Sequence, residues 1–186
     1  MLRLLVAPIA AILLIATHCG TWAQVPTSAY DYEFEAIEGG KLPLSQWRGK
    51  ALLVVNVASF CGFTAQYEGL QKLWERYQSR GLVVVGVPSN DFGAQEPKSE
   101  SEILGFCQGA FGVNFPMTAK LGVSGGQAHP FYLWARDTLG LTSTPRWNFH
   151  KYLVGRDGKL IEGFGSSVTP LSDTMINAVE KALGTP

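Results

Sequence analysis

The fold of this chain is decided by an apolar run and the turn behind it, Ala51-Leu52-Leu53-Val54-Val55-Asn56-Val57 followed by Ala58-Ser59-Phe60-Cys61-Gly62-Phe63-Thr64. A continuous run of aliphatic and β-branched residues predicts a strand covered on both faces. Residues 65–79 repeat apolar side chains at helical spacing, so a helix is expected next. Cys61 therefore lies near a predicted helix N-terminus, where the helix dipole and free backbone amides stabilise a thiolate, the reactive form of cysteine.

The neighbours of Cys61 narrow its chemistry. A disulfide exchanger of the thioredoxin type needs a second cysteine three residues on, where this chain has Thr64. A Cys-x-x-x-Cys metal site needs one four residues on, where it has Ala65. A thiol that works alone points to peroxide reduction or another oxidation of that thiol. The alternative is a small buried cysteine that fills a strand end, because free cysteine is among the most buried residue types.

The first residues are predicted to be a targeting segment. Arg3 precedes an apolar stretch from Leu4 to Ala16, and Thr21-Trp22-Ala23 offers a small-x-small cleavage site. The stretch is short for a membrane span, although an uncleaved anchor is the alternative. We therefore expect a signal peptide over residues 1–23, a single domain over residues 24–186, export to a bacterial periplasm, and no stable membrane association after cleavage.

Charge excludes some classes of partner. The chain has 15 basic and 15 acidic side chains, and removal of Arg3 with the leader leaves one fewer basic than acidic. Nothing in this balance favours nucleic acid or an anionic membrane. Cys61 and Cys107 remain after cleavage, and one pair is no disulfide framework. His129 and His150 have no suitably spaced partners, so no metal and no bound cofactor are expected.

Strand and helix patterns alternate along the chain. A half-buried strand with Tyr32, Phe34 and Ala36 precedes a Gly39-Gly40 turn. The remaining expected elements, in order, are strands 51–57 and 82–87 around the helix of residues 65–79, a helix over 99–110, a hairpin of 152–154 and 159–164, and a last helix opened by Thr169-Pro170, with Leu171, Met175, Ile176 and Val179 facing inward. This order predicts an α/β, thioredoxin-like fold: a central mixed β-sheet flanked by helices, with an N-terminal β-hairpin extension.

Two further segments carry neutral polar side chains in apolar or glycine-rich settings. Gln95 follows the second central strand, and loops at the carboxyl ends of parallel strands meet at one edge, so it is expected near Cys61. Trp147 and Asn148 precede the hairpin and offer an indole N–H and a carboxamide. Neutral donors can stabilise a thiolate and the charge that moves onto a peroxide oxygen. Taken singly, Gln95 is better interpreted as a residue that caps a turn, and Trp147 as a core residue.

Together these strings resemble the three signatures of the glutathione peroxidase family. They are Asn56-Val57-Ala58-Ser59-Phe60-Cys61-Gly62-Phe63-Thr64-Ala65-Gln66-Tyr67, Phe92-Gly93-Ala94-Gln95-Glu96-Pro97 and Trp147-Asn148-Phe149-His150-Lys151-Tyr152-Leu153-Val154. The resemblance implies a thioredoxin-fold peroxidase in which Cys61 is the peroxidatic residue. It also implies that Gln95, Trp147 and Asn148 complete the family's catalytic tetrad.

Departures from the family pattern shape the other expectations. Cysteine replaces the selenocysteine of many animal members, so the surroundings must activate it. The segment 121–145 lacks the insertion that tetrameric members use, which favours a monomer. The basic glutathione-binding residues of those members have no match here, so glutathione and a thioredoxin-like protein both stay open as the thiol reductant. Cys107 lies about one residue from the resolving cysteine of many relatives and is either that residue or a buried structural thiol.

The function expected from the sequence is reduction of hydrogen peroxide and organic hydroperoxides by thiols, through a sulfenic acid on Cys61, in protection against oxidative stress. The alternative from another class is a non-catalytic periplasmic redox sensor or binding module that uses oxidation of Cys61 as a signal. A general disulfide exchanger comes third, because Thr64 argues against it.

Overall fold

A four-stranded mixed sheet forms the centre of the computed structural model, which describes residues 27–184. The strand order is β4-β3-β5-β6, with bounds Leu82–Pro88 (β4), Ala51–Val57 (β3), Lys151–Val154 (β5) and Leu160–Phe164 (β6). β3 and β4 run parallel, whereas β5 is antiparallel to both β3 and β6. An antiparallel hairpin of β1 (Glu33–Glu35) and β2 (Lys41–Pro43) precedes them. The predicted central sheet and N-terminal hairpin are confirmed.

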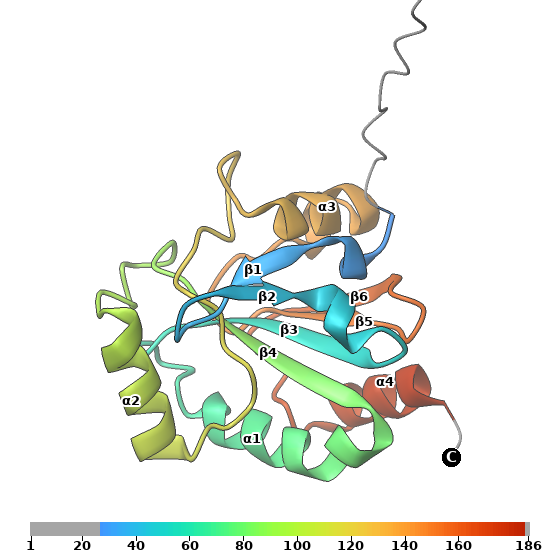
Figure 1. Ribbon diagram of the computed structural model, residues 1–186, viewed down its shortest axis with the longest axis horizontal. Helices are drawn as coiled ribbons and strands as arrows, with labels where there is room; N and C mark the ends of the chain where they lie inside the picture. The colour runs from blue at the N-terminus through green and yellow to red at the C-terminus, as the bar shows by residue number, and fades with distance from the viewer. Residues whose placement is uncertain (1–26, 185–186) are drawn as a thin grey trace, which may run out of the picture.

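Helices cover both faces of this sheet. Their bounds are Gln66–Tyr77 (α1), Glu100–Phe111 (α2), Pro130–Leu139 (α3) and Asp173–Leu183 (α4), with 3-10 turns at Ala29–Asp31, Leu44–Trp47, Gln78–Arg80 and Leu141–Ser143. In Figure 1, α1 and α4 lie below the sheet, α3 and the β1–β2 hairpin lie above it, and α2 lies at the left. The layers are those of a thioredoxin-like α/β fold.

The central strand separates two apolar cores. Successive side chains of a strand point to opposite faces, and β3 is buried on both. Leu53 and Val55 join the core beneath α1, α2 and α4, whereas Leu52 and Val54 join the core beneath α3 and the N-terminal segment. A strand with both faces covered needs no polar residues, which explains the unbroken apolar run in the sequence.

Helix α3 was not predicted from the sequence. Its residues are apolar on most sides, so the periodic pattern of a surface helix is weak, and its cap is unusual. The backbone N–H of Phe131 donates to His129 Nδ1 (3.3 Å) in place of a common cap residue, and Pro130 is the first helical position. Phe131 and Ala135 are fully buried against the sheet. This helix is therefore stabilised by its packing against the sheet rather than by a local sequence pattern.

The predicted start of the last helix was wrong by three residues. The helix begins at Asp173, and Ser172 is its N-cap, with its hydroxyl oxygen accepting from the Met175 N–H (3.4 Å). Leu171 is exposed and Ile176 only partly buried, although both were expected inside. Pro170 is buried under α1, next to Gly69, so it ends the preceding loop rather than opening the helix. The predicted capping box of α2 is confirmed, since Glu102 accepts from both the Ser99 hydroxyl (2.6 Å) and the Ser99 N–H (3.0 Å).

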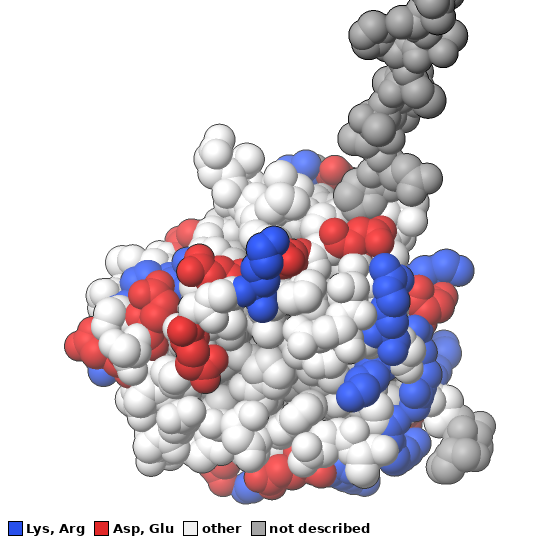
Figure 2. All heavy atoms as spheres, viewed as in Figure 1, with Lys and Arg blue, Asp and Glu red and all other residues white. Residues whose placement is uncertain are grey.

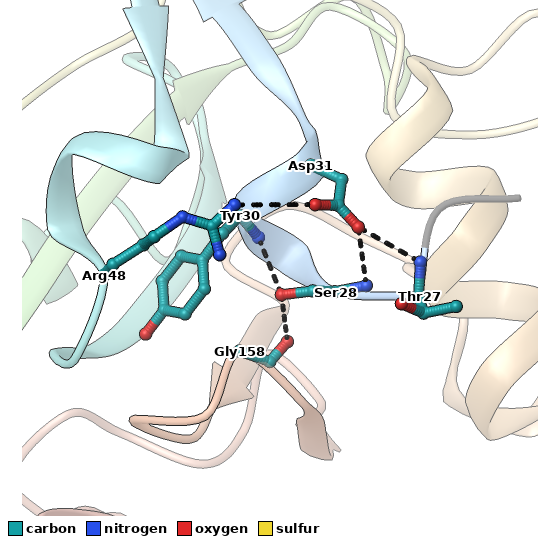
Figure 3. A network of polar contacts seen from close by, with 6 residues as sticks. All are labelled: Thr27, Ser28, Tyr30, Asp31, Arg48 and Gly158. Atoms are coloured by element: carbon teal, nitrogen blue, oxygen red, sulfur yellow. Dashed lines mark hydrogen bonds and ion pairs between the residues drawn. The ribbon is translucent and has the colours of Figure 1, made fainter. Parts of the chain in front are cut away.

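The described chain is anchored from its first residues onward (Figure 3). Ser28 caps the turn Ala29–Asp31, and the Asp31 carboxylate accepts from the backbone N–H groups of Thr27 (3.2 Å) and Ser28 (3.1 Å). The Ala29 N–H donates to the Gly158 carbonyl (2.9 Å) in the β5–β6 turn. The N-terminal segment is therefore bound to the amino end of β3, opposite the end that leads to Cys61.

The face of the molecule drawn in Figure 2 carries charges of both signs. Basic side chains gather along the right-hand edge, and much of the centre is uncharged. In residues 27–184, no helix combines the length and the apolar character needed to cross a membrane.

The contact at Gly158 generates a prediction for stability. Gly158 has a φ of 80°, and a Cβ there would overlap the Ser28 hydroxyl and lie 2.6 Å from the Tyr30 ring. Gly158→Ala should cost about 3 kcal/mol of unfolding free energy, from the left-handed backbone and from displacement of the N-terminal segment. Gly40→Ala is the matched control, since its φ is 84° with nothing within 4 Å, and should cost only about 1 kcal/mol. Equal losses in urea unfolding would contradict the packing argument.

Candidate functional site

Asn56, near the carboxyl end of β3, brings distant parts of the site together. Its backbone N–H donates to the His150 carbonyl (3.2 Å), and its carbonyl accepts from the Phe149 N–H (2.6 Å). Its side-chain Nδ2 donates to the Trp147 carbonyl (3.2 Å). The segment with Trp147 and Asn148 is therefore held on the strand that leads directly to Cys61.

The turn with Cys61 is closed by its own residues. The Cys61 N–H donates to Thr64 Oγ1 (3.0 Å), and the Thr64 hydroxyl donates to the Ala58 carbonyl (2.9 Å). The Cys61 sulfur accepts from the Phe63 N–H (3.4 Å). Thr64 therefore supports the turn at the position where a disulfide exchanger has its second cysteine. Cys61 is 8% exposed, whereas Phe60 and Phe63 beside it are open to solvent.

Gln95 and Asn148 contact each other directly. Asn148 Nδ2 donates to Gln95 Oε1 (2.9 Å) and more weakly to the Phe92 carbonyl (3.4 Å). The backbone carbonyl of Gln95 accepts from the Phe60 N–H (3.1 Å), next to Cys61. The bond from Asn148 Nδ2 fixes Gln95 Oε1 as the end of the carboxamide that faces Asn148, so the other end, Nε2, is available to donate elsewhere. Asn148 thus orients Gln95, and both amides come from separate predicted motifs.

Trp147 lies at the open rim of this pair. Its indole is partly exposed and packs at 6.0 Å from the Phe92 ring. Gly93 lies next to the Trp147 ring and the Gln95 side chain, and its φ of 66° is a left-handed conformation that favours glycine. Across residues 27–184, the hydrogen bond found to the Cys61 sulfur comes from Phe63, not from Gln95, Trp147 or Asn148. Catalytic hydrogen bonds are often long until the reactants are bound.

Two left-handed residues flank the amide pair. Ala94 has a φ of 52° and Phe149 a φ of 64°, and neither is glycine. Such backbone conformations are costly and persist only where the surroundings impose them. Ala94 precedes Gln95 and Phe149 follows Asn148, so the strain lies immediately beside both carboxamides. This placement is typical of a functional site rather than of a connecting loop.

A buried carboxylate holds the Cys61 turn against the Gln95 loop. Glu96 has no exposed surface, and its Oε2 accepts from the Ser59 N–H (2.8 Å) and the Ser59 hydroxyl (2.9 Å). The Glu96 N–H in turn donates to Asn90 Oδ1 (2.8 Å). Burial raises the pKa of the Glu96 carboxyl, and the Ser59 hydrogen bonds partly offset this. A role for Glu96 was not predicted from the sequence, in which its place beside Gln95 is the one signal.

Cys107 lies in α2 with no exposed surface, in the same apolar core as Cys61. Both are free thiols. Burial raises the pKa of the Cys107 thiol to about 11, with the Tyr67 hydroxyl lowering it and the Glu96 carboxylate raising it further. The structure thus surrounds this thiol with conditions that disfavour its thiolate.

The histidines serve the fold. His129 caps α3, and its Nε2 lies 3.1 Å from the Glu33 carbonyl. His150 is buried, and burial lowers its pKa to about 4, with a further lowering from the charge of Lys151. Within the described range, no group of three His, Cys, Asp or Glu side chains is arranged to hold a metal ion.

Fold and site together define a class. A single cysteine between strand and helix of a thioredoxin-like sheet, with a glutamine, a tryptophan and an asparagine at the same edge, is typical of a thiol peroxidase. The glutathione peroxidase family model matches residues 29–136. The chain belongs to the glutathione peroxidase family and is an oxidoreductase of the peroxide-reducing class.

Individual relatives agree with this assignment. The chain is 41% identical to the hydroperoxy fatty acid reductase of Synechocystis sp. over 169 residues, covering 87% of this chain and 99% of that protein. The crystal structure of Trgpx in its apo form matches with a TM-score of 0.69 and 34% identity over 87% of this chain and 99% of that one. A thioredoxin-family thiol:disulfide interchange protein from Chlorobium tepidum has a TM-score of 0.62 at 18% identity, covers 88% of this chain and 100% of its own, and shows the fold alone.

The burial of Glu96 generates a prediction about pH. A carboxyl whose pKa is raised by folding makes the folded state bind more protons than the unfolded chain, so its contribution to stability falls as pH rises above about 4.5. Gln keeps an acceptor for Ser59 without the charge. The unfolding free energy of Glu96→Gln, relative to that of the native protein, should therefore increase as pH rises from 4 to 7. Urea unfolding of both proteins measures this difference.

Glu102→Gln is the matched control with the opposite sign. Hydrogen bonds from Ser99 lower the pKa of the exposed Glu102 carboxyl, so the native protein is stabilised as this group ionises. The stability of Glu102→Gln should fall relative to that of the native protein as pH rises to about 4.5 and just above it, and should then change little up to pH 7. Parallel pH dependences of the two variants would contradict the assignment of a strained buried charge to Glu96.

Proposed function

We propose that Cys61 is the peroxidatic residue and that Gln95, Trp147 and Asn148 act with it. The Cys61 thiolate attacks one oxygen of a hydroperoxide, the O–O bond breaks, and the other oxygen leaves as hydroxide or alkoxide. The leaving oxygen takes a proton to become water or an alcohol. Sulfur is oxidised to the sulfenic acid, and the peroxide is reduced by the same two electrons.

The observation that carries this proposal is the amide pair held beside the Cys61 turn. Asn148 fixes Gln95 so that Gln95 Nε2 is free, and Phe60 ties the Gln95 backbone to the turn. Preorganised neutral donors stabilise an oxyanion as it forms without reorganising at the moment of reaction. The Gln95 carboxamide and the indole of Trp147 are donors of this kind, and Asn148, whose Nδ2 donates to Gln95 and Phe92, orients Gln95.

Two external thiols then complete the cycle. The first condenses with the sulfenic acid to a mixed disulfide and releases water, and the second regenerates Cys61 as a free thiol and leaves a disulfide of the two reductant thiols. Cys107 as an internal resolving thiol is the alternative, in which case a thioredoxin-like protein is the donor. Complete burial in α2 and the raised pKa of Cys107 favour the external route with a small thiol such as glutathione.

The turnover of two cysteine variants tests both steps. Cys61→Ser should lose at least about a hundredfold in peroxidase rate, because a serine hydroxyl is a far weaker nucleophile than a thiolate. Cys107→Ala should keep most of its turnover with a small thiol, since Cys107 takes no part in the external route. The measurement is steady-state reduction of hydrogen peroxide and of an organic hydroperoxide with glutathione, and separately with thioredoxin.

Other outcomes identify the alternatives. A Cys61→Ser protein with most of its rate would exclude Cys61 as the nucleophile. A native protein that consumes one equivalent of peroxide and stops with every reductant is a sensor rather than a peroxidase. A Cys61–Cys107 disulfide, found by peptide mapping after one equivalent of peroxide, would establish Cys107 as the resolving residue and overturn the external route.

We also propose that the mature protein is an exported monomer that acts in the periplasm. The predicted signal peptide and its predicted cleavage after Ala23 lie outside the described residues. In support, Ala23 precedes the anchored start of the fold at Thr27, and the family match begins at residue 29. The short segment 121–145 supports a monomer.

Native mass spectrometry of the protein from its own host tests both parts. The expected species has the mass of one chain that begins at Gln24. A mass that includes residues 1–23 would contradict cleavage, and a multiple of the chain mass would contradict the monomer. Purification from the periplasmic fraction, with a cytoplasmic marker enzyme as control, tests the compartment.

A further inference from the structure

Lys151 is a charged side chain at a core position. It belongs to β5, where Val55 and Phe164 are its paired neighbours, and both belong to the core beneath α1 and α4. Its side chain has no exposed surface, and burial lowers the pKa of its amine to about 7. In the part of the chain that the structure describes, no carboxylate pairs with Lys151. An apolar side chain of similar length would avoid the cost of burying this group, so stability alone does not explain it.

The amine of Lys151 has two acceptors. Its Nζ donates to Gln66 Oε1 (2.6 Å) and to the Val168 carbonyl (2.7 Å). Gln66 is the first residue of α1, the helix that follows Cys61, and Val168 lies in the loop before α4. The Lys151 side chain therefore joins three separate elements directly under the site.

The hydrogen bonds continue from Gln66 to the catalytic asparagine. Gln66 Nε2 donates to the Ser166 carbonyl (2.7 Å), and the Ser166 hydroxyl donates to the Asn148 carbonyl (2.6 Å). Lys151 occupies Gln66 Oε1 and so fixes which end of that carboxamide faces Ser166. A continuous series of short hydrogen bonds thus runs from Lys151 through Gln66 and Ser166 to Asn148.

We propose that Lys151 is a positioning residue for peroxide reduction, which acts through Gln66 and Ser166 to hold Asn148 against the helix that follows Cys61. The inference rests on the proposed roles of Cys61 and Asn148. Asn148 orients Gln95, so a displaced Asn148 backbone moves both carboxamides away from the leaving oxygen. The thiolate itself is held by its own turn, which contains none of these residues.

This separation gives a test that a merely structural role would not satisfy. Reaction with peroxide needs both the thiolate and the donors to the leaving oxygen, whereas alkylation by iodoacetamide needs mainly an accessible thiolate. Lys151→Met keeps the length of the side chain and removes its donors. Its second-order rate with hydrogen peroxide should fall about tenfold or more, since small displacements of catalytic groups reduce rates steeply. Its rate of alkylation at Cys61, followed by mass spectrometry of the peptide that contains Cys61, should stay within about twofold of the native rate. The reason is that the Lys151 amine acts on the donors to the leaving oxygen and not on the Cys61 thiolate.

Ser166→Ala keeps the proposal testable if Lys151→Met does not fold. This variant removes only the bond to the Asn148 carbonyl, at a partly exposed position. Its rate with hydrogen peroxide should fall, by less than in Lys151→Met, while its alkylation rate is retained. Ser172→Ala is the matched control, because it removes a serine hydroxyl that caps α4 and contacts neither Lys151 nor Asn148. It should leave both rates unchanged.

Three results would overturn the proposal: both rates retained in Lys151→Met, both rates reduced together, or an unchanged peroxide rate in Ser166→Ala. Failure of the proposed function is distinguishable from these. If Cys61 is not the nucleophile, blocking Cys61 with iodoacetamide leaves the peroxide rate of the native protein intact, whatever the Lys151 and Ser166 variants do.

Discussion

The site depends on the three hydrogen bonds that Asn56 makes to residues 147–150. Two of them extend the pairing of β3 and β5 beyond the sheet, and the third uses the Asn56 side chain. β3 leads to Cys61, and the segment before β5 brings Asn148 and Trp147. Without Asn56, these two stretches of chain would still belong to neighbouring strands but would have no fixed position past the ends of those strands. The geometry of the site is therefore a continuation of the sheet.

Around this centre, polar groups are buried in pairs that each join two loops. Glu96 joins the Gln95 loop to the Cys61 turn through Ser59, and the amide of Asn148 joins the Gln95 loop to the segment before β5. Unsatisfied polar groups are costly in a core, so each pair is held firmly while its partner is present. Cys61, Gln95 and Asn148 thus come from three different stretches of chain that the fold keeps in register, and the left-handed backbones of Ala94 and Phe149 lie next to the two carboxamides.

Much of this arrangement could be predicted from the sequence, for a physical reason. The strand, turn and helix around Cys61 follow from local pattern, and parallel neighbouring strands bring Gln95 to the same edge. Helix α3 could not be predicted, since apolar residues occupy most of its sides and a histidine is its cap. Glu96 and Lys151 were also missed as functional residues. Their partners lie far away in the chain, and only the folded structure shows that a glutamate faces Ser59 or that a lysine faces Gln66.

The anchoring of the N-terminal segment at Gly158 has a practical consequence. The described chain begins at the amino end of β3, whereas Cys61 lies past its carboxyl end. Anything joined ahead of Thr27, whether a purification tag, a carrier protein or a chemical linker to an electrode or bead, is attached on the side away from the Cys61 sulfur. Immobilised in this orientation, the molecules would present their reactive ends to the surrounding liquid. Attachment at the start of the domain is therefore the natural design for a surface-bound peroxide scavenger built on this chain.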